Sequence, residues 1–109
     1  RSVIFSKRYA STSPSIATAS ASATAAAALL MEHLPHIEVS TNPYDLERHG
    51  RGESYHPTAA PSAVVAPSCT DEVIQVIKLC SEYEIPVIPY GAGTSVEGHV
   101  CAIHGGISL

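Results

Sequence analysis

The stretch Ile85-Pro86-Val87-Ile88-Pro89-Tyr90-Gly91-Ala92-Gly93-Thr94-Ser95-Val96-Glu97-Gly98 decides the fold, because a short apolar run leads into a glycine-rich loop. Residues 87–90 are typical of a short strand, and the glycines that follow allow backbone conformations that other residues disfavour. Successive amides in such a loop can form a concave nest for phosphate oxygens, and the hydroxyls of Thr94 and Ser95 add donors. The stretch therefore predicts a strand followed by a candidate phosphate-binding loop.

The sequence on either side predicts the elements that accompany this loop. Residues 63–66 form a continuous apolar run between two prolines, which is typical of a buried strand. Residues 70–84 carry apolar side chains at helical spacing and two acids in the first turn, and Pro86 stops the predicted helix. After a Gly105-Gly106 turn, residues 107–109 begin another strand.

This order of elements predicts an α+β fold. Residues 61–109 would be the first βαβ portion of a sheet domain, preceded by an approach segment and a disordered leader. A strand, a crossover helix and a second strand in so few residues favour parallel pairing with a right-handed crossover. Because these strands are too few to bury both faces of a sheet, we expect the chain to be the N-terminal fragment of a larger domain.

The loop alone leaves the class of nucleotide open. Gly93 and Gly98 have the spacing of a Walker loop, but His99-Val100 stands where that loop needs Lys and Ser or Thr, which disfavours NTP hydrolysis. The glycines read GxGxxxxG, whereas the dinucleotide fingerprint needs GxGxxG at the start of a helix. Since the loop contains no Lys or Arg, an anion would be held mainly by amides and hydroxyls. A bare structural turn is the other interpretation.

Several segments together resemble a known family of flavoenzymes. Residues 63–67, 70–73, 85–98 and 105–109 resemble the opening of the FAD-binding domain of the vanillyl-alcohol oxidase/p-cresol methylhydroxylase (PCMH) superfamily. Within it, residues 101–106 are similar to the mitochondrial D-lactate dehydrogenase (cytochrome) group. Tyr44, Arg48 and residues 52–54 also match the segment that precedes the domain in that group.

The resemblance implies that FAD is the cofactor and that backbone amides of the glycine-rich loop hold its pyrophosphate. Carried onto this sequence, the implied cofactor-binding residues are Pro89, Tyr90, Gly91, Ala92, Gly93, Thr94, Ser95 and Gly98. Some members of the superfamily attach the flavin covalently through a His in this loop. Thr94 stands at that position here, so the resemblance implies non-covalent FAD.

The reaction that the resemblance implies is oxidation of a D-2-hydroxy acid, with D-lactate to pyruvate as the first choice and cytochrome c as the electron acceptor. The family's catalytic and metal-binding residues lie beyond the segment that matches, so no catalytic residue is assigned. Two alternatives stay open. The chain is a truncated, non-catalytic product, or it belongs to a related FAD enzyme acting on D-2-hydroxyglutarate, glycolate or alkyl-glycerone phosphate.

Residues 1–31 have the composition of a leader. They contain Arg1, Lys7 and Arg8 without any acid, followed by a run of Ala, Ser and Thr, as in mitochondrial transit peptides. A low-complexity linker is the alternative. Because the chain starts at Arg1 and not at Met, we expect its true N-terminus to lie upstream.

Residues 32–60 form a polar approach segment broken by prolines. A turn at residues 42–45 is expected to open a short helix through Arg48, followed by a loop at residues 49–52. We expect residues 38–55 to pack on something outside this chain.

Charge and cysteine usage exclude several classes of function. After residue 31 there are three basic and ten acidic residues, which argues against nucleic acid as a partner. No apolar run approaches the roughly 20 residues that span a bilayer, so no transmembrane segment is predicted. Three widely spaced cysteines form no disulfide framework. His99, Cys101 and His104 are close in sequence but match no common zinc spacing, so no metal site is predicted.

Overall fold

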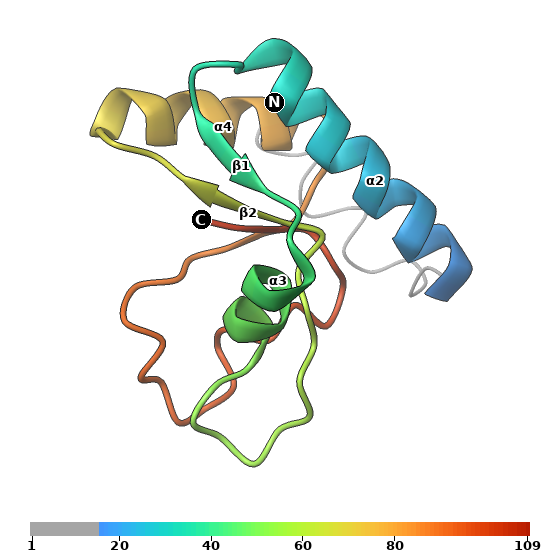
Figure 1. Ribbon diagram of the computed structural model, residues 1–109, viewed down its shortest axis with the longest axis vertical. Helices are drawn as coiled ribbons and strands as arrows, with labels where there is room; N and C mark the ends of the chain where they lie inside the picture. The colour runs from blue at the N-terminus through green and yellow to red at the C-terminus, as the bar shows by residue number, and fades with distance from the viewer. Residues whose placement is uncertain (1–15) are drawn as a thin grey trace.

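The computed structural model describes residues 16–109, with side chains from residue 24 onward. These residues form three helices and four short strands, and the strands make one sheet (Figure 1). In chain order, they are α2 (Ile16–His33), β1 (Glu38–Ser40), α3 (Pro43–Gly50), β2 (Ala63–Ala66), α4 (Thr70–Glu82), β3 (Val87–Ile88) and β4 (Ile107–Ser108).

The strands form a four-stranded mixed sheet in the order β1-β2-β4-β3. Strand β1 is antiparallel to β2, whereas β4 is parallel to both β2 and β3. The prediction of a parallel β-α-β arrangement is correct in direction. It is wrong in implying that β2 and β3 pair directly, because β4 lies between them and is bonded on both sides. In this order β3 is an edge strand, so the loop that follows it starts at one edge of the sheet.

Side chains alternate between the two faces of the sheet, and each face packs against different helices. The register aligns Ala63, Ile107 and Val87 in one row and Val64, Ser108 and Ile88 in the next. The first row faces the apolar core that α2 and α4 supply, and the second row faces α3. In Figure 1, α2 and α4 lie on the upper side of the strands and α3 lies below them.

The core is built from small and branched apolar side chains. Leu30 from α2, Val76 and Cys80 from α4, and Ile107 from β4 are all almost fully buried. Burial raises the pKa of the Cys80 thiol to about 11, so this cysteine is an uncharged, space-filling group at neutral pH.

Helix α2 differs from the disordered leader expected over residues 1–31. Residues 1–15 lie outside the described residues, so that part of the expectation stays a prediction. Residues 16–31 are helical, and Ala26, Ala27 and Leu30 are buried in the core. Alanine is the best helix former, and its small side chain lets a helix lie close to a sheet. The same Ala-rich composition that is typical of a leader therefore also produces a packed helix.

The approach segment packs on this chain through β1 and α3. Tyr44 and Tyr55 remain 71% and 90% exposed, so the expectation of a further contact outside the chain for residues 38–55 stays a prediction. Strand β1 covers the β2 edge, with Glu38 opposite Ala66 and Ser40 opposite Val64. Helix α3 begins where the turn was predicted, because the Asn42 side chain accepts a hydrogen bond from the Tyr44 amide (3.0 Å).

Helix α3 extends through Gly50, two residues further than predicted, into what was expected to be loop. The carbonyl of Gly50 accepts a hydrogen bond from the Ala59 amide (3.1 Å). A Cβ at position 50 would overlap the backbone of Ala59 and Ala60. The absence of a side chain therefore lets the helix end against the segment that returns toward β2.

Helix α4 agrees with the prediction except at its end. The side chain of Glu72, in the first turn of α4, binds the residue that precedes the helix. Its carboxylate accepts hydrogen bonds from the Ser68 amide (2.6 Å) and the Ser68 hydroxyl (2.9 Å). These bonds lower the pKa of Glu72. The helix ends at Glu82, two residues early, because Glu84 adopts a positive φ of 57° that reverses the chain before Pro86. Across residues 16–109, no helix has both the length and the apolar character needed to cross a bilayer.

Candidate functional site

The glycine-rich loop leaves the sheet at the end of β3 and returns at β4. Its start is fixed by a pair of backbone hydrogen bonds: the Tyr90 amide donates to the Leu109 carbonyl (2.7 Å), and the Leu109 amide donates to the Ile88 carbonyl (2.9 Å). Gly93 and Gly98 have φ values of 71° and 77°, a region that L side chains rarely adopt. The prediction of a loop that needs glycine at these positions is confirmed.

The amides at the tip of this loop are free to bind an acceptor. In the described part of the chain, the backbone N–H groups of residues 91–96 donate no hydrogen bond to another protein atom. The next amide, that of Glu97, makes only a long contact with the Ser95 hydroxyl (3.4 Å). A run of unused, closely spaced amides fits the oxygens of a phosphate or pyrophosphate. The loop therefore offers donors of the kind that the cofactor implied by the sequence needs.

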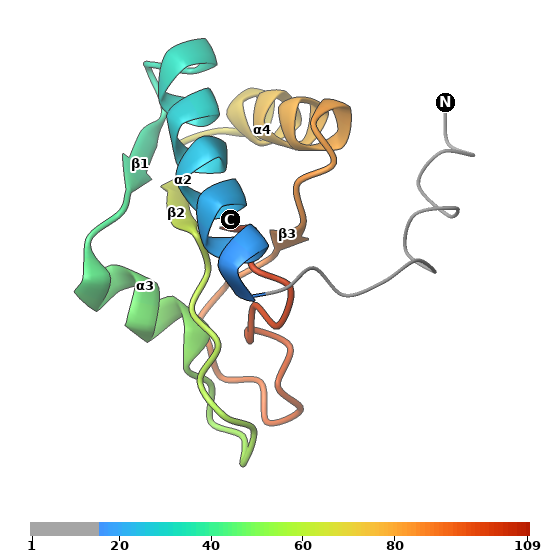
Figure 2. The same cartoon turned by 90° about the vertical axis from the view of Figure 1, so that its right-hand side faces the viewer.

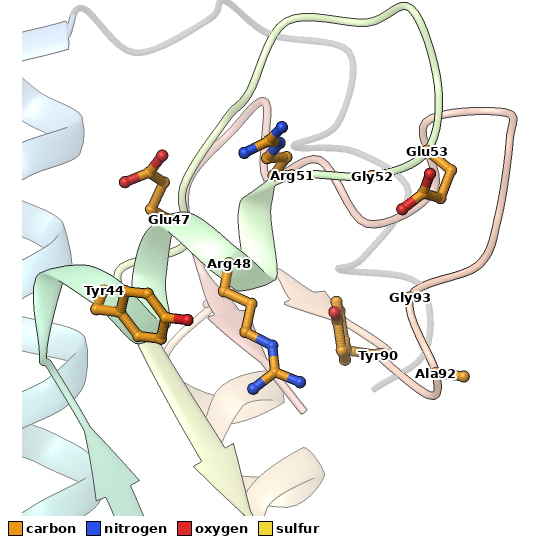
Figure 3. Close-up of a pocket in the computed structure, with 9 residues that line it drawn as sticks. All are labelled: Tyr44, Glu47, Arg48, Arg51, Gly52, Glu53, Tyr90, Ala92 and Gly93. Carbon is orange, nitrogen blue, oxygen red and sulfur yellow. The ribbon is translucent and has the colours of Figure 1, made fainter.

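Helix α3 faces this loop across an open cleft of about 410 Å³. One wall is the start of the loop and the other is α3 with the residues that follow it (Figure 3). The lining residues are Tyr44, Glu47, Arg48, Arg51, Gly52, Glu53, Tyr90, Ala92 and Gly93.

Arg48 supplies a charge that the loop itself lacks. Its side chain extends from α3 between Tyr44 and Tyr90 (Figure 3). Among the described residues, no carboxylate forms an ion pair with it. An exposed, unpaired guanidinium beside free amides favours an anionic ligand, because Arg donates several hydrogen bonds to phosphate or carboxylate oxygens.

His49, next to Arg48, connects α3 to both the sheet and the loop. Its Nδ1 lies 2.8 Å from the Ser108 Oγ, and its ring stacks on Tyr90 with a centroid distance of 4.0 Å. Partial burial lowers the pKa of His49 below 6.5, and the positive charge of Arg48 lowers it further, against the opposing effect of Asp45. The neutral imidazole is therefore favoured in this position.

A second loop, residues 51–62, packs against the glycine-rich loop and the residues that follow it. A Cβ at Gly52 would contact Val100, and one at Gly98 would overlap the His56 ring. The Ala102 amide also donates to the Ala59 carbonyl (2.8 Å). Both loops lie at the same end of the molecule in the two views (Figures 1 and 2).

The predicted cofactor-binding residues are brought together only in part. Tyr90, Ala92 and Gly93 line the cleft. The other predicted residues do not line it: Pro89, Gly91, Thr94, Ser95 and Gly98. The Ser95 hydroxyl contacts the Nδ1 of His99 (3.1 Å) and so is partly engaged within the loop. Within residues 16–109, no group of three or more His, Cys, Asp and Glu side chains is arranged to hold a metal.

Local spacing gives no reason to place Glu47, Arg51 or Glu53 at this site, although the family resemblance includes residues 52–54. They lie about one helix and two strands away from the loop along the chain, and local spacing does not report contacts of that kind. Besides that resemblance, the signal that could have found them is the cluster of charged residues after the Asn42-Pro43 helix start.

The mixed sheet carries a glycine-rich loop of free amides at the end of a parallel strand, and such a loop can hold the phosphates of a nucleotide cofactor. Residues 61–109 match a family described as FAD binding domain. The match identifies this part of the chain as similar to an FAD-binding domain, and it indicates that the cofactor is FAD.

The chain is similar to three relatives in particular. It is 46% identical over 61 residues to the probable D-lactate dehydrogenase, mitochondrial, of Danio rerio, covering 56% of this chain and 12% of the relative. It is 41% identical over 73 residues to the D-lactate dehydrogenase [cytochrome], mitochondrial, of Arabidopsis thaliana, covering 63% and 13%. It is 43% identical over 49 residues to the glycolate oxidase subunit GlcD of Bacillus subtilis (strain 168), covering 45% and 10%. The chain thus spans only about an eighth of the length of the first two relatives.

Proposed function

We propose that the glycine-rich loop holds the pyrophosphate of a non-covalently bound FAD. The residues involved are those expected from the sequence: Pro89, Tyr90, Gly91, Ala92, Gly93, Thr94, Ser95 and Gly98. The observation that carries this proposal is the run of unused amides at residues 91–96. Thr94 stands where some members of the superfamily carry the histidine that links the flavin, and this supports a dissociable cofactor.

The residues of this chain have three parts in the proposed site. The loop amides donate hydrogen bonds to the pyrophosphate oxygens, and the hydroxyl of Thr94 adds a donor. Arg48 offsets the negative charge from across the cleft. Tyr90 fixes the point where the loop leaves the sheet. When bound, FAD supplies the acceptor for the two electrons that leave the substrate.

We further propose that the reaction is oxidation of a D-2-hydroxy acid to its 2-oxo acid, with D-lactate as substrate and cytochrome c as electron acceptor. The support is similarity to relatives named D-lactate dehydrogenase, two of them also named mitochondrial. The similarity to a glycolate oxidase subunit favours glycolate as the second candidate substrate. Substrate contacts and proton transfer belong to parts of the relatives that this chain does not cover.

The test uses the full-length protein that contains this sequence. The purified protein should show the absorbance spectrum of a bound flavin. Acid precipitation should release FAD into solution, because the cofactor is not covalently attached. Flavin that stays with the precipitated protein would contradict non-covalent binding. Absence of any flavin, even after incubation with FAD, would contradict the proposed function as a whole.

A second assay identifies the substrate and the electron acceptor independently of each other. D-Lactate, glycolate, D-2-hydroxyglutarate and L-lactate are each offered with an artificial dye and then with cytochrome c. We expect D-lactate to give the highest kcat/KM and to reduce cytochrome c, and L-lactate to be inactive. A higher kcat/KM for glycolate or D-2-hydroxyglutarate would reassign the substrate.

We also propose a mitochondrial location. The basic, acid-free composition of residues 1–31 supports it, as do the names of two relatives. A reporter fused to residues 1–31 should enter mitochondria, whereas the same fusion with Arg1, Lys7 and Arg8 changed to Gln should stay outside. A reporter that remains in the cytosol in both cases would contradict the location.

A further inference from the structure

We propose that His49 is the positioning residue of the cofactor loop, holding it in shape through the ring of Tyr90. This inference rests on the proposed flavin site, because it assigns a role within that site. It concerns a residue that no sequence pattern singled out and that does not itself line the cleft.

His49 is anchored at the sheet. Its Nδ1 lies 2.8 Å from the hydroxyl of Ser108, a β4 residue that is only 1% exposed. A buried hydroxyl needs a hydrogen-bond partner, and losing that partner is costly. In the described residues, every buried side-chain polar atom has such a partner, and His49 supplies it for Ser108. The imidazole is therefore held in one orientation against the sheet.

The other side of the His49 ring supports Tyr90. The two rings are stacked, with centroids 4.0 Å apart and planes inclined by 26°. The main chain of Tyr90 is fixed separately by its hydrogen bond to the Leu109 carbonyl (2.7 Å). With its backbone held by the sheet and its ring held by His49, the Tyr90 side chain has little freedom.

Tyr90 in turn touches the loop where its backbone is most unusual. At Gly93, whose φ is 71°, a Cβ would overlap the hydroxyl and the Cζ of Tyr90. The tyrosine ring therefore lies directly against the main chain of Gly93 and limits where this part of the loop can go. Ser108, His49, Tyr90 and Gly93 form a continuous chain of contacts from the buried sheet to the free amides.

A purely structural role for His49 would lower the stability of the protein without a specific effect on cofactor affinity. A positioning role predicts that affinity falls more than stability alone accounts for, because the loop amides are no longer held together. It also predicts that a flat ring at position 49 preserves affinity, whereas a polar group without a ring does not.

The experiment compares His49→Gln, His49→Phe and Val76→Ala in the full-length flavoprotein. The first removes the ring and keeps a hydrogen-bonding group for Ser108, and the second keeps a ring against Tyr90. Val76 is fully buried between α4 and the sheet, on the face opposite α3, so Val76→Ala is a control that lowers stability away from the loop. The dissociation constant is measured for FAD and for ADP, which carries the pyrophosphate without the flavin ring.

We expect His49→Gln to raise the dissociation constants for FAD and ADP about tenfold, an effect comparable to the loss of an orienting group behind a ligand-binding residue. His49→Phe should stay within about threefold of the parent protein, and Val76→Ala should leave both constants nearly unchanged.

Equal losses for His49→Gln and Val76→Ala, or for His49→Gln and His49→Phe, would overturn the positioning role. So would a His49→Gln protein that binds FAD as tightly as the parent. If the parent protein itself binds neither FAD nor ADP, the proposed function fails, and that result is distinct from a failure of the positioning role alone.

Discussion

At the scale of single residues, the site joins groups that lie far apart in the sequence. The amides of the loop can bind phosphate oxygens but carry no net charge. The guanidinium of Arg48 lies across the cleft without a carboxylate partner among the described residues. The cleft is also lined by Arg51, Glu47 and Glu53, so its two basic and two acidic residues balance. The position of Arg48 therefore matters more than the net charge of the cleft.

Replacing Arg48 with Gln should weaken binding of the cofactor. We expect the dissociation constants for FAD and ADP to rise about tenfold, which corresponds to losing one charge-assisted hydrogen bond worth about 1.5 kcal/mol. Riboflavin, which has no phosphate, should bind equally to both proteins. Lys78→Gln, an equal charge change on the exposed side of α4, is the control. A similar loss in that variant would show that only overall charge is involved.

Two glycines of the loop, Gly91 and Gly93, differ in whether the backbone at that position tolerates a side chain. Gly93 has a φ of 71° and lies against the Tyr90 hydroxyl, whereas a Cβ at Gly91 would meet no atom within 4 Å. We expect Gly93→Ala to lower the free energy of unfolding by about 1–3 kcal/mol, because its conformation is strained for alanine. Gly91→Ala should change it by less than about 1 kcal/mol. Denaturant titrations without FAD measure both, and equal losses would contradict the close contact with Tyr90.

The lowered pKa of His49 predicts how stability depends on pH. The folded protein disfavours the imidazolium, mainly through burial and then through Arg48, so below pH 6.5 the unfolded state binds the proton more readily. The neutral His49 side chain therefore contributes fully to the free energy of unfolding above pH 6.5. This contribution is lost as the pH falls through the lowered pKa that His49 has in the folded protein. The parent protein should therefore lose more stability than His49→Gln between pH 7 and pH 5. Parallel curves for the two proteins would show that His49 does not contribute.

Among the helices and strands, the sequence predicts those whose position depends on the local spacing of apolar residues. The apolar run at residues 63–66 and the helical periodicity from residue 70 onward lead to β2 and α4 almost as predicted. The position of β4 between β2 and β3 was missed, because pairing order depends on contacts between distant segments. The α3 wall of the cleft was missed for the same reason. Helix α2 was assigned to a leader, since low-complexity composition does not reveal whether a helix has a face that can be buried.

The packing of α2 can be tested by contrasting two neighbouring side chains. Leu30 is fully buried in the core, whereas Met31 is 46% exposed. We expect Leu30→Ala to lower the free energy of unfolding by about 2–5 kcal/mol, the usual cost of such a change in a core. Met31→Ala should cost much less. Should Leu30→Ala leave stability unchanged, α2 would not be part of the folded core, and the leader would extend through it.

At the scale of the whole molecule, the structure separates a packed end from an end made of loops. Helices α2 and α4 cover one face of the sheet, and residues 51–62 and 91–105 gather at the other end (Figures 1 and 2). The two loops contact each other through Gly52 and Val100 and through His56 and Gly98. A ligand bound at the loop amides should therefore order both loops together, even though only one of them donates to it.

This coupling predicts where the cofactor protects the protein against hydrogen exchange. FAD at one hundred times its dissociation constant should stabilise the folded state by about 2.7 kcal/mol through mass action. We expect the largest local slowing at residues 91–98, because amides that exchange freely become hydrogen-bond donors. A second, smaller effect is expected at residues 51–62, which only pack against the first loop. Residues 24–33 of α2, distant from the cleft, should change least and serve as the internal reference. Protection confined to α2 and α4 would place the cofactor on the opposite face of the sheet. Protection of residues 91–98 without any change in residues 51–62 would instead show that the two loops move independently.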